Sequence, residues 1–341
     1  MSKGDGFRCG VVGYGGAFNM GRLHLTSMQK NKRMEVAAVC ELDPTRRAVA
    51  NDDFPGIKTY GSVGNMLRGA ELELVTIITP HNTHAKLAVQ CLNAGVNVVC
   101  EKPLAITSAE VKQMLTAAKK KKVMISAFHN RRWDGDFVVL RDLIRKEKII
   151  GRVFRIEAGF FGYGEQGTWW RSNKEVSGGA IYDWGAHFTD WILNIVTDSV
   201  DWVSGYQVKN NEWSKYDNED HSEYTVQFKG GCTATLTMSN LSMSSRPRWR
   251  ILGEKGSIED VGGKYLVNTI VNGRQMSTEV PFAESNWDAY YENVYKHLMG
   301  RAKLVITPES AGRVIGVLEA ANISAARGVR SPRLPIGPAT M

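Results

Sequence analysis

The sequence predicts an α/β protein with two parts: an N-terminal, doubly wound parallel sheet and a C-terminal α/β part with a large, open and mostly antiparallel sheet. Two observations predict this division. Up to residue 128, short runs that are apolar throughout alternate with helical segments, which is typical of strands buried on both faces by helices. Beyond that point the strand patterns alternate, and all nine tryptophans lie there. We therefore expect domains at residues 1–128 and 129–341.

The first domain contains five apolar runs that we expect to be its strands: residues 7–13, 34–40, 74–79, 96–100 and 123–128. A helix is expected at residues 84–93, where apolar side chains recur on one face before Gly95. Another should begin at the capping box formed by Thr107 and Glu110 and end in the lysine run at residues 119–122. Strands that alternate with helices predict a parallel sheet.

The second domain contains alternating strand patterns at residues 153–157, 222–228 and 232–238. Gly230 and Gly231 separate the last two, which predicts a hairpin. Helices are expected at residues 287–299 and 308–327. Strands with one apolar face predict an open sheet that is covered by helices on one side.

The chain has a net charge of +8. Its densest basic run, residues 119–122, falls where a helix should end, and cations are favoured there by the helix dipole. No apolar run approaches the roughly 20 residues of a membrane-spanning helix. We therefore expect neither a nucleic acid nor a membrane as partner.

The N-terminal residues lack the apolar segment of a secretion signal, and this predicts a cytoplasmic protein. The cysteines are odd in number and widely spaced, so neither a disulfide framework nor a metal site is expected. We expect buried, reduced thiols at Cys9, Cys40, Cys91, Cys100 and Cys232.

A glycine-rich turn follows the first strand and leads into a helix. Gly13 allows the tight turn, and Gly15 lets the backbone approach a pyrophosphate at the helix N-terminus. This is the opening of a Rossmann fold, although Phe18 stands where a third glycine is usual and Gly21 comes three residues later. The residues expected to contact the dinucleotide here are Gly13, Tyr14, Gly15, Gly16, Ala17, Phe18, Asn19 and Met20.

Glu41 ends the second strand, 20 positions after Gly21. A carboxylate at this point binds the hydroxyls of the adenosine ribose and would repel the extra phosphate of NADP. Arg46 and Arg47 follow closely and could counteract that repulsion; Arg46 is included among the cofactor-binding residues. We expect NAD as the cofactor, with NADP less favoured.

Two further polar segments come at the ends of parallel strands, where open α/β sheets bind ligands. One contains Thr79, Pro80, Asn82 and His84, and the other is residues 101–103, Glu-Lys-Pro. We expect Thr79, Pro80, Asn82, His84, Glu101 and Lys102 to contribute to the cofactor site. Lys102 is a candidate proton donor, since burial and neighbouring charges can lower the pKa of a lysine. A lysine after a strand can equally be a surface charge.

The stretch from Gly178 to Asp190 holds a histidine among carboxylates. If it is helical, Asp183, His187 and Asp190 line one face. A histidine beside a carboxylate makes an acid–base pair near neutral pH. An aspartate–histidine hydrogen bond in a packed core explains the same spacing, so the residues alone leave both interpretations open.

Together these motifs resemble the glucose–fructose oxidoreductase / inositol dehydrogenase / rhizopine catabolism (Gfo/Idh/MocA) family over roughly residues 8–328. The resemblance implies hydride transfer between a hydroxyl carbon of a sugar or polyol and the nicotinamide. By position, Lys102, Asp183 and His187 match the family's catalytic group. It implies that His187 takes the hydroxyl proton, that Lys102 hydrogen-bonds the same oxygen, and that Asp183 orients both.

Aromatic faces with polar tips suit sugar rings, and two such clusters are candidates for substrate contacts. Packing in the core is an alternative for each. The substrate-binding residues that we expect are Lys102, Arg131, Trp133, Trp170, Arg171, Asp183 and His187. The resemblance also implies a homodimer or homotetramer that forms through the open sheet.

Three functions use these residues differently. The first is an NAD-dependent dehydrogenase of a sugar, anhydro-sugar or inositol-like polyol. The second is a glycosidase or lyase of the same family that recycles its NAD in each turnover. The third, a non-catalytic dinucleotide sensor, is disfavoured because a sensor has no need of Lys102, Asp183 and His187 together.

Overall fold

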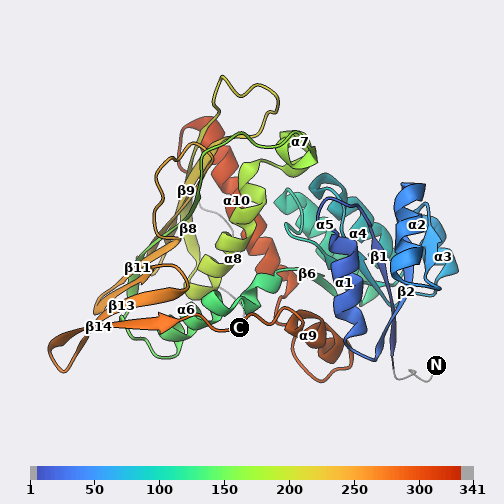
Figure 1. The fold of residues 1–341 in the computed structure, drawn as a ribbon, viewed down its shortest axis with the longest axis horizontal. Helices are drawn as coiled ribbons and strands as arrows, with labels where there is room; N and C mark the ends of the chain where they lie inside the picture. The colour runs from blue at the N-terminus through green and yellow to red at the C-terminus, as the bar shows by residue number, and fades with distance from the viewer. Residues whose placement is uncertain (1–5, 332–341) are drawn as a thin grey trace. The chain divides into compact units, whose positions relative to one another are not determined.

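The computed structural model describes residues 6–331. They fall into two compact units (Figure 1). One unit comprises the residues up to Phe128 together with Asp288–Ala311, and the other comprises His129–Trp287 together with the residues from Gly312 onward.

The sheet of the first unit is parallel throughout and has the strand order β3-β2-β1-β4-β5-β6, which confirms the predicted doubly wound fold. Five strands match the predicted runs, and the three-residue edge strand β3 is additional. Their bounds are β1 (Phe7–Val12), β2 (Met34–Cys40), β3 (Lys58–Tyr60), β4 (Leu74–Ile77), β5 (Asn97–Cys100) and β6 (Ile125–Ala127). The central strands β1, β4 and β5 are almost completely buried, as helices on both faces require.

The helices of this unit include both predicted ones. In α5 the Thr107 hydroxyl and the Glu110 carboxylate form the expected capping box, and the helix ends at the lysine run with Lys122 in the left-handed conformation. The helices are α1 (Met20–Gln29), α2 (Pro44–Asp53), α3 (Val63–Gly69), α4 (His84–Asn93), α5 (Ser108–Lys121) and α9 (Ala289–Leu298), with a short 3-10 helix η1 (His81–Thr83) before α4.

Helix α9 corrects the expectation of one continuous second domain over residues 129–341. Although it follows the second sheet in the sequence, it belongs to the first unit. The physical reason is a pair of adjacent aromatic side chains, Tyr290 and Tyr291, whose ring centroids lie 4.7 and 5.9 Å from that of Phe128. Both tyrosines are buried, so this helix completes the core beneath β6.

The second unit has an eight-stranded sheet in the order β14-β13-β12-β11-β7-β10-β9-β8, in which only the β7–β10 pairing is parallel. The predicted hairpin is present, because β9 and β10 pair antiparallel across Gly230 and Gly231. The strands are β7 (Val153–Phe161), β8 (Val200–Val208), β9 (His221–Phe228), β10 (Thr233–Ser239), β11 (Trp249–Gly253), β12 (Gly256–Asp260), β13 (Lys264–Val271) and β14 (Arg274–Pro281).

One face of this sheet forms the core of the unit. Along β9, Tyr224, Val226 and Phe228 are buried, and the residues between them are half-buried. Helices lie on one side of the sheet (Figure 1), and ten of the twelve residues of α8 are buried, among them the polar His187, Thr189 and Asp190. The helices are α6 (Gly135–Arg145), α7 (Lys174–Ser177), α8 (Trp184–Ile195) and α10 (Pro308–Arg327), with 3-10 turns η2 (Asn130–Trp133), η3 (Trp170–Ser172) and η4 (Ala180–Tyr182).

All five cysteines are buried free thiols, as the sequence predicts. Burial raises the pKa of Cys40 to about 11 and the pKa values of Cys91 and Cys232 to about 12, so these thiols are unreactive at neutral pH. Within residues 6–331, no helix combines the length and apolar character that a membrane span needs.

Candidate active site

The turn after β1 has the geometry that a pyrophosphate requires. Gly13 has a φ of 101°, and a Cβ there would lie 2.1 Å from the carbonyl oxygen of Ile78. A Cβ on Gly15 would instead meet nothing within 4 Å. Residues 15–19 are exposed, and α1 starts directly after them with no acidic residue in its first turn. The N–H groups of the first turn of α1 therefore face an exposed loop, and that first turn carries no acidic residue that would repel an anion.

Gly21 explains the unusual spacing of the glycines. A Cβ at this position would lie 2.6 Å from Cδ2 of Tyr14 and 2.9 Å from the Gly13 carbonyl oxygen. The close contact between helix and strand, which the third glycine normally permits, is thus made at Gly21. Phe18 lies in the lengthened loop and is 57% exposed. The side chain of Tyr14 is buried and donates to Asp53 at 2.8 Å, so only the backbone of Tyr14 is left for a cofactor.

Glu41 is held in place at the end of β2. Its Oε2 accepts the backbone N–H of Tyr14 at 2.6 Å, and its Oε1 accepts that of Asp43 at 3.1 Å. The carboxylate is therefore fixed next to the glycine turn. Leu42, which the motif analysis did not single out, is 80% exposed beside it and offers an apolar surface to an adenine ring.

The two arginines that follow Glu41 lie in different places. Arg46 donates to the Tyr14 carbonyl oxygen at 2.9 Å, and one guanidinium nitrogen would be 3.3 Å from a Cβ on Gly16. Its positive charge thus lies at the glycine turn. Arg47 donates instead to the carbonyl oxygens of Glu41 and Leu42.

The side chain of His84, one of the expected cofactor-binding residues, ties two segments of the first unit together. Its two ring nitrogens lie 2.8 Å from the carbonyl oxygens of Thr79 and Pro103, and the side chain is fully buried. It joins the segments that follow β4 and β5. Burial lowers the pKa of His84, and the two carbonyls only partly oppose this effect. In the same segment the Thr79 hydroxyl pairs with that of Thr83, and Asn82 is exposed.

The carboxylate of Glu101, another of the expected cofactor-site residues, faces the protein interior. Oε1 lies 3.0 Å from Nε2 of His24, and Oε2 accepts the backbone N–H of Lys102 at 2.9 Å. Burial by itself raises the pKa of Glu101, but the hydrogen bond and charge of His24 and the charge and N–H of Lys102 outweigh it and lower that pKa. The half-buried Lys102 therefore follows an ionised carboxylate that fixes its main chain.

In the second unit, Asp183 and His187 lie at the start of α8. Asp183 immediately precedes the helix with a non-helical ψ of −91°, and His187 is one turn further on. His187 is buried, with its ring centroid 5.7 Å from that of Trp184 and 6.1 Å from that of His129. His187 is therefore enclosed by neighbouring rings and largely excluded from bulk water.

Asp190, the third residue of the predicted face, forms an ion pair with Arg132. Both of its oxygens accept from Arg132, at 2.8 and 2.6 Å, and both side chains are buried. Burial raises the pKa of Asp190, but the charges of Arg132 and His129 outweigh it and lower that pKa overall. Asp190 is therefore one half of a buried ion pair.

Two of the predicted substrate residues, Arg131 and Arg171, each lie in an arginine–tryptophan cluster. Arg171 lies 5.1 and 5.0 Å from the ring centroids of Trp169 and Trp170, and it donates to Asp183 at 3.0 Å. Arg131 lies 4.6 and 5.3 Å from the ring centroids of Trp184 and Trp287, and it donates to Asp134 at 3.0 Å. Trp133 is half-buried, and its carbonyl oxygen accepts the N–H of Asn286. The contacts of Trp184 and Trp287 with Arg131 were not predicted.

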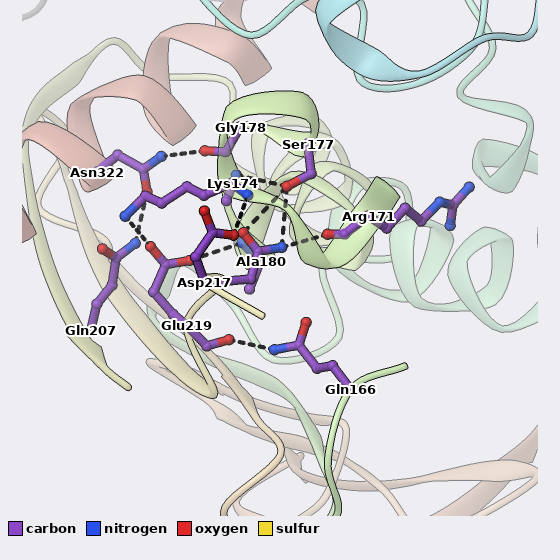
Figure 2. Close-up of polar contacts among 12 residues, drawn as sticks. Gln166, Arg171, Lys174, Ser177, Gly178, Ala180, Gln207, Asp217, Glu219 and Asn322 are labelled. Atoms are coloured by element: carbon purple, nitrogen blue, oxygen red, sulfur yellow. Dashed lines mark hydrogen bonds and ion pairs between the residues drawn. The ribbon is translucent and has the colours of Figure 1, made fainter. Parts of the chain in front are cut away.

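A buried polar scaffold holds the segment that leads to Asp183 (Figure 2). Asn322 donates to the Gly178 carbonyl oxygen at 2.9 Å, and Glu219 accepts the N–H of Ala180 at 3.0 Å. Asn218 donates to the carbonyl oxygen of Arg171 at 2.5 Å. Sequence reasoning missed these three residues, because their contacts join segments that are distant in the sequence and no local pattern marks them.

The fold and the glycine turn define an NAD-binding oxidoreductase. Residues 7–129 match the family model described as "Oxidoreductase family, NAD-binding Rossmann fold". Residues 137–259 match the model "GFO/IDH/MocA C-terminal domain". The chain belongs to the Gfo/Idh/MocA oxidoreductase family.

Known relatives cover almost the whole chain. The scyllo-inositol 2-dehydrogenase (NADP(+)) IolW of Bacillus subtilis is 25% identical over 94% of this chain and 94% of its own length. The myo-inositol 2-dehydrogenase of Thermotoga maritima is 25% identical over 84% of this chain and 86% of its own. The structure of the WlbA dehydrogenase from Bordetella pertussis in complex with NADH and UDP-GlcNAcA has a TM-score of 0.81 at 24% identity, covering 96% of this chain and 98% of that one.

Proposed function

We propose that this oxidoreductase oxidises a secondary hydroxyl of a sugar, anhydro-sugar or cyclic polyol and transfers the hydride to the nicotinamide of NAD. The observation that carries the proposal is Lys102 at the end of β5, with its main chain fixed by an ionised carboxylate. The shielded His187 on α8 supplies the matching acid–base group. The inositol dehydrogenases among the relatives support a polyol substrate.

In the proposed reaction His187 accepts the hydroxyl proton as the hydride leaves the carbon. Lys102 donates a hydrogen bond to the same oxygen and stabilises its developing negative charge. Asp183 is proposed to orient this group, and its carboxylate accepts a hydrogen bond from Arg171 at 3.0 Å. NAD would supply the hydride acceptor. The residues of the chain bind and orient the substrate and move the proton.

The proposed substrate contacts come from the two arginine–tryptophan clusters, with Trp170, Arg171, Arg131 and Trp133 as the leading residues. Each arginine there is already paired with an aspartate. The clusters therefore offer hydrogen-bond donors and aromatic faces without a large net charge, which suits a neutral ring with several hydroxyls.

NAD is proposed as the preferred cofactor because Glu41 is fixed beside the glycine turn, where it would repel a ribose 2′-phosphate. Arg46 acts in the opposite direction, since its charge lies at the same turn. The relatives include one named for NADP(+) and one whose complex contains NADH. The ratio of kcat/KM for NAD and NADP tests the preference, and a ratio below one would contradict it.

The function itself is tested by screening inositols, sugars and anhydro-sugars with purified protein and free NAD at 340 nm. A steady rise in absorbance with one of these polyols is expected. Formation of product without net NADH would support the redox-neutral glycosidase or lyase instead. If no compound of these classes reacts by either measurement, the proposal is wrong.

A further inference from the structure

The first unit contains a buried chain of polar side chains that the proposed reaction does not use. The hydroxyl of Tyr291 lies 2.9 Å from that of Thr76 and 2.7 Å from Nδ1 of His24. Nε2 of the same histidine lies 3.0 Å from Glu101, whose other oxygen accepts the backbone N–H of Lys102. The chain thus starts in the sheet and ends on the main chain of the proposed catalytic lysine.

Four separate parts of the sequence contribute to this chain. Thr76 is in β4, His24 in α1, and Tyr291 in α9, while Glu101 follows β5. Thr76, His24 and Tyr291 are buried completely or nearly so, and Glu101 is 9% exposed. Burying polar groups is unfavourable unless they are hydrogen-bonded, and a connected network specifies one arrangement of its members.

The direction of the hydrogen bonds follows from Glu101. An ionised carboxylate only accepts, so Nε2–H of His24 donates to Oε1 while Lys102 donates to Oε2. Nδ1 of His24 then faces the Tyr291 hydroxyl, which can donate to it or accept from it. Tyr291 and the aromatic ring of Phe128, 4.2 Å from the imidazole centroid, together fix the plane of His24.

The neighbouring Tyr290 provides an internal comparison. It is as buried as Tyr291, but its hydroxyl donates to Ser126, which in turn donates to the carbonyl oxygen of Ile306. That chain connects core elements to one another. The chain through Tyr291 differs because it ends at Lys102, so its geometry determines the position of a reacting group.

We propose that His24 and Tyr291 are positioning residues that hold the Glu101 carboxylate in one orientation and thereby position Lys102. In this position Lys102 hydrogen-bonds the substrate oxygen and stabilises its developing negative charge. This inference rests on the proposed function of Lys102. It assigns to α1 a second task beyond cofactor binding, because the helix that follows the glycine turn also carries the histidine that orients the carboxylate. Small displacements of a reacting group are costly in rate, whereas they leave cofactor affinity unchanged.

The test compares Tyr291→Phe with the matched variant Tyr290→Phe. Each removes one buried hydroxyl from the same helix, and both should lower the melting temperature to a similar extent. For Tyr291→Phe we expect kcat to fall about tenfold or more, with KM and Kd for NAD within about twofold, as misplacement of one reacting group predicts. Tyr290→Phe should keep the wild-type kcat. Equal kcat values for the two variants would overturn the inference.

A double-mutant cycle separates positioning from general loss of packing. Residues that act through one network have non-additive effects. The fold reduction in kcat for Glu101→Gln combined with Tyr291→Phe should therefore be smaller than the product of the fold reductions for the two single variants. Glu101→Gln combined with Tyr290→Phe should be multiplicative. Additivity in the first cycle would contradict the proposal. If Tyr291→Phe does not fold, His24→Gln removes the next member of the chain, and an unchanged kcat there would overturn the inference.

Lys102→Ala in the same assay distinguishes the two proposals. If Lys102→Ala keeps near-normal turnover, the proposed function of Lys102 fails, and the inference fails with it. If Lys102→Ala is inactive but Tyr291→Phe equals Tyr290→Phe, only the positioning inference fails.

Discussion

At the residue scale, Lys102 and His187 are the two groups whose removal should separate chemistry from binding. Lys102 follows the end of β5, and its backbone N–H donates to the Glu101 carboxylate, whereas His187 lies within α8. By contrast, the polar atoms of His84 and Asp190 hold elements together.

We expect Lys102→Ala and His187→Ala each to reduce kcat by at least about a hundredfold, which is typical for loss of a general acid–base or charge-stabilising group. The Kd for NAD, measured by fluorescence titration, should stay within about twofold. Lys86→Ala, which removes an exposed lysine of α4, is the control and should be fully active. Near-normal turnover in either site variant would refute the assignment.

Two glycines of the turn should respond to substitution in opposite ways. At Gly21 an added Cβ meets the Gly13 carbonyl and the Tyr14 ring, so Gly21→Ala should lower the unfolding free energy by about 1–3 kcal/mol. At Gly15 an added Cβ meets nothing within the protein but blocks a pyrophosphate. Gly15→Ala should therefore keep the wild-type stability and bind NAD more weakly.

Thermal unfolding without cofactor, followed by NAD titration, measures both effects on the same samples. A stable Gly21→Ala protein would show that helix α1 and β1 are not in close contact. Unchanged NAD affinity in Gly15→Ala would contradict the proposed position of the pyrophosphate.

The sequence could predict the residues of the cofactor turn but not every role within them. Gly13 and Gly15 follow from local backbone requirements, which short motifs encode. The contact made by Gly21 depends on the angle between α1 and β1, and the pairing of Asp190 with Arg132 joins positions 58 residues apart. Such contacts depend on tertiary packing, so the spacing Asp183, His187, Asp190 alone could not distinguish a catalytic face from a buried ion pair.

At the scale of elements, the segments after β4 and β5 are joined by a single imidazole. His84 lies between the carbonyl oxygens of Thr79 and Pro103, with no exposed surface. Because burial lowers its pKa, the neutral form is favoured in the folded protein, and in that form the single N–H of the ring donates to one of the two carbonyl oxygens. The unfolded chain binds a proton at this position more readily than the folded one.

Stability should therefore decrease as the pH falls below about 6.5, the usual pKa of histidine, because the unfolded state takes up the extra proton. We expect His84→Gln to lose part of this dependence. Urea unfolding at pH 7.5 and pH 5.5 measures it, with Tyr290→Phe as a buried variant that removes no imidazole. If His84→Gln keeps the full pH dependence of the wild type, the effect arises elsewhere.

Secondary structure was largely predictable where apolar residues recur regularly over many positions, as in α4 and α5. It was also predictable where a short run is apolar throughout, as in the buried strands. Strand β3 was missed because Lys58–Tyr60 is too short to show any period. The antiparallel hairpin of β9 and β10 was predictable from alternation and two glycines, whereas the parallel pairing of β7 with β10 joins strands that are distant in the sequence.

At the scale of the whole molecule, the helices of the second unit lie on one side of the eight-stranded sheet (Figure 1), so its other face has no helix over it within residues 6–331. Its central strands present polar cross-strand pairs there, including Thr225 with Thr235 at 3.0 Å and Thr237 with Glu223 at 2.8 Å. Tyr206 is 61% exposed on β8. A broad, flat face of this kind is suited to a second copy of itself, because a two-fold axis brings identical strands together.

We propose that the protein is a homodimer or homotetramer that assembles through this face. Light scattering after size-exclusion chromatography should give a mass of two or four chains. Thr235→Arg, which places a charge near the centre of the face, should reduce that mass while leaving the melting curve of each chain cooperative. A monomer at all concentrations of wild-type protein would contradict the proposal.

The return of α9 to the first unit has a consequence for synthesis on the ribosome. Tyr290 and Tyr291 fill space against Phe128 and His24, so the dinucleotide-binding unit lacks part of its interior until the chain has been made beyond residue 298. An N-terminal fragment that stops at residue 128 would expose an apolar surface beneath β6. The order of translation and the order of core completion therefore differ in this protein, and its first unit finishes folding only after most of the second has been synthesised.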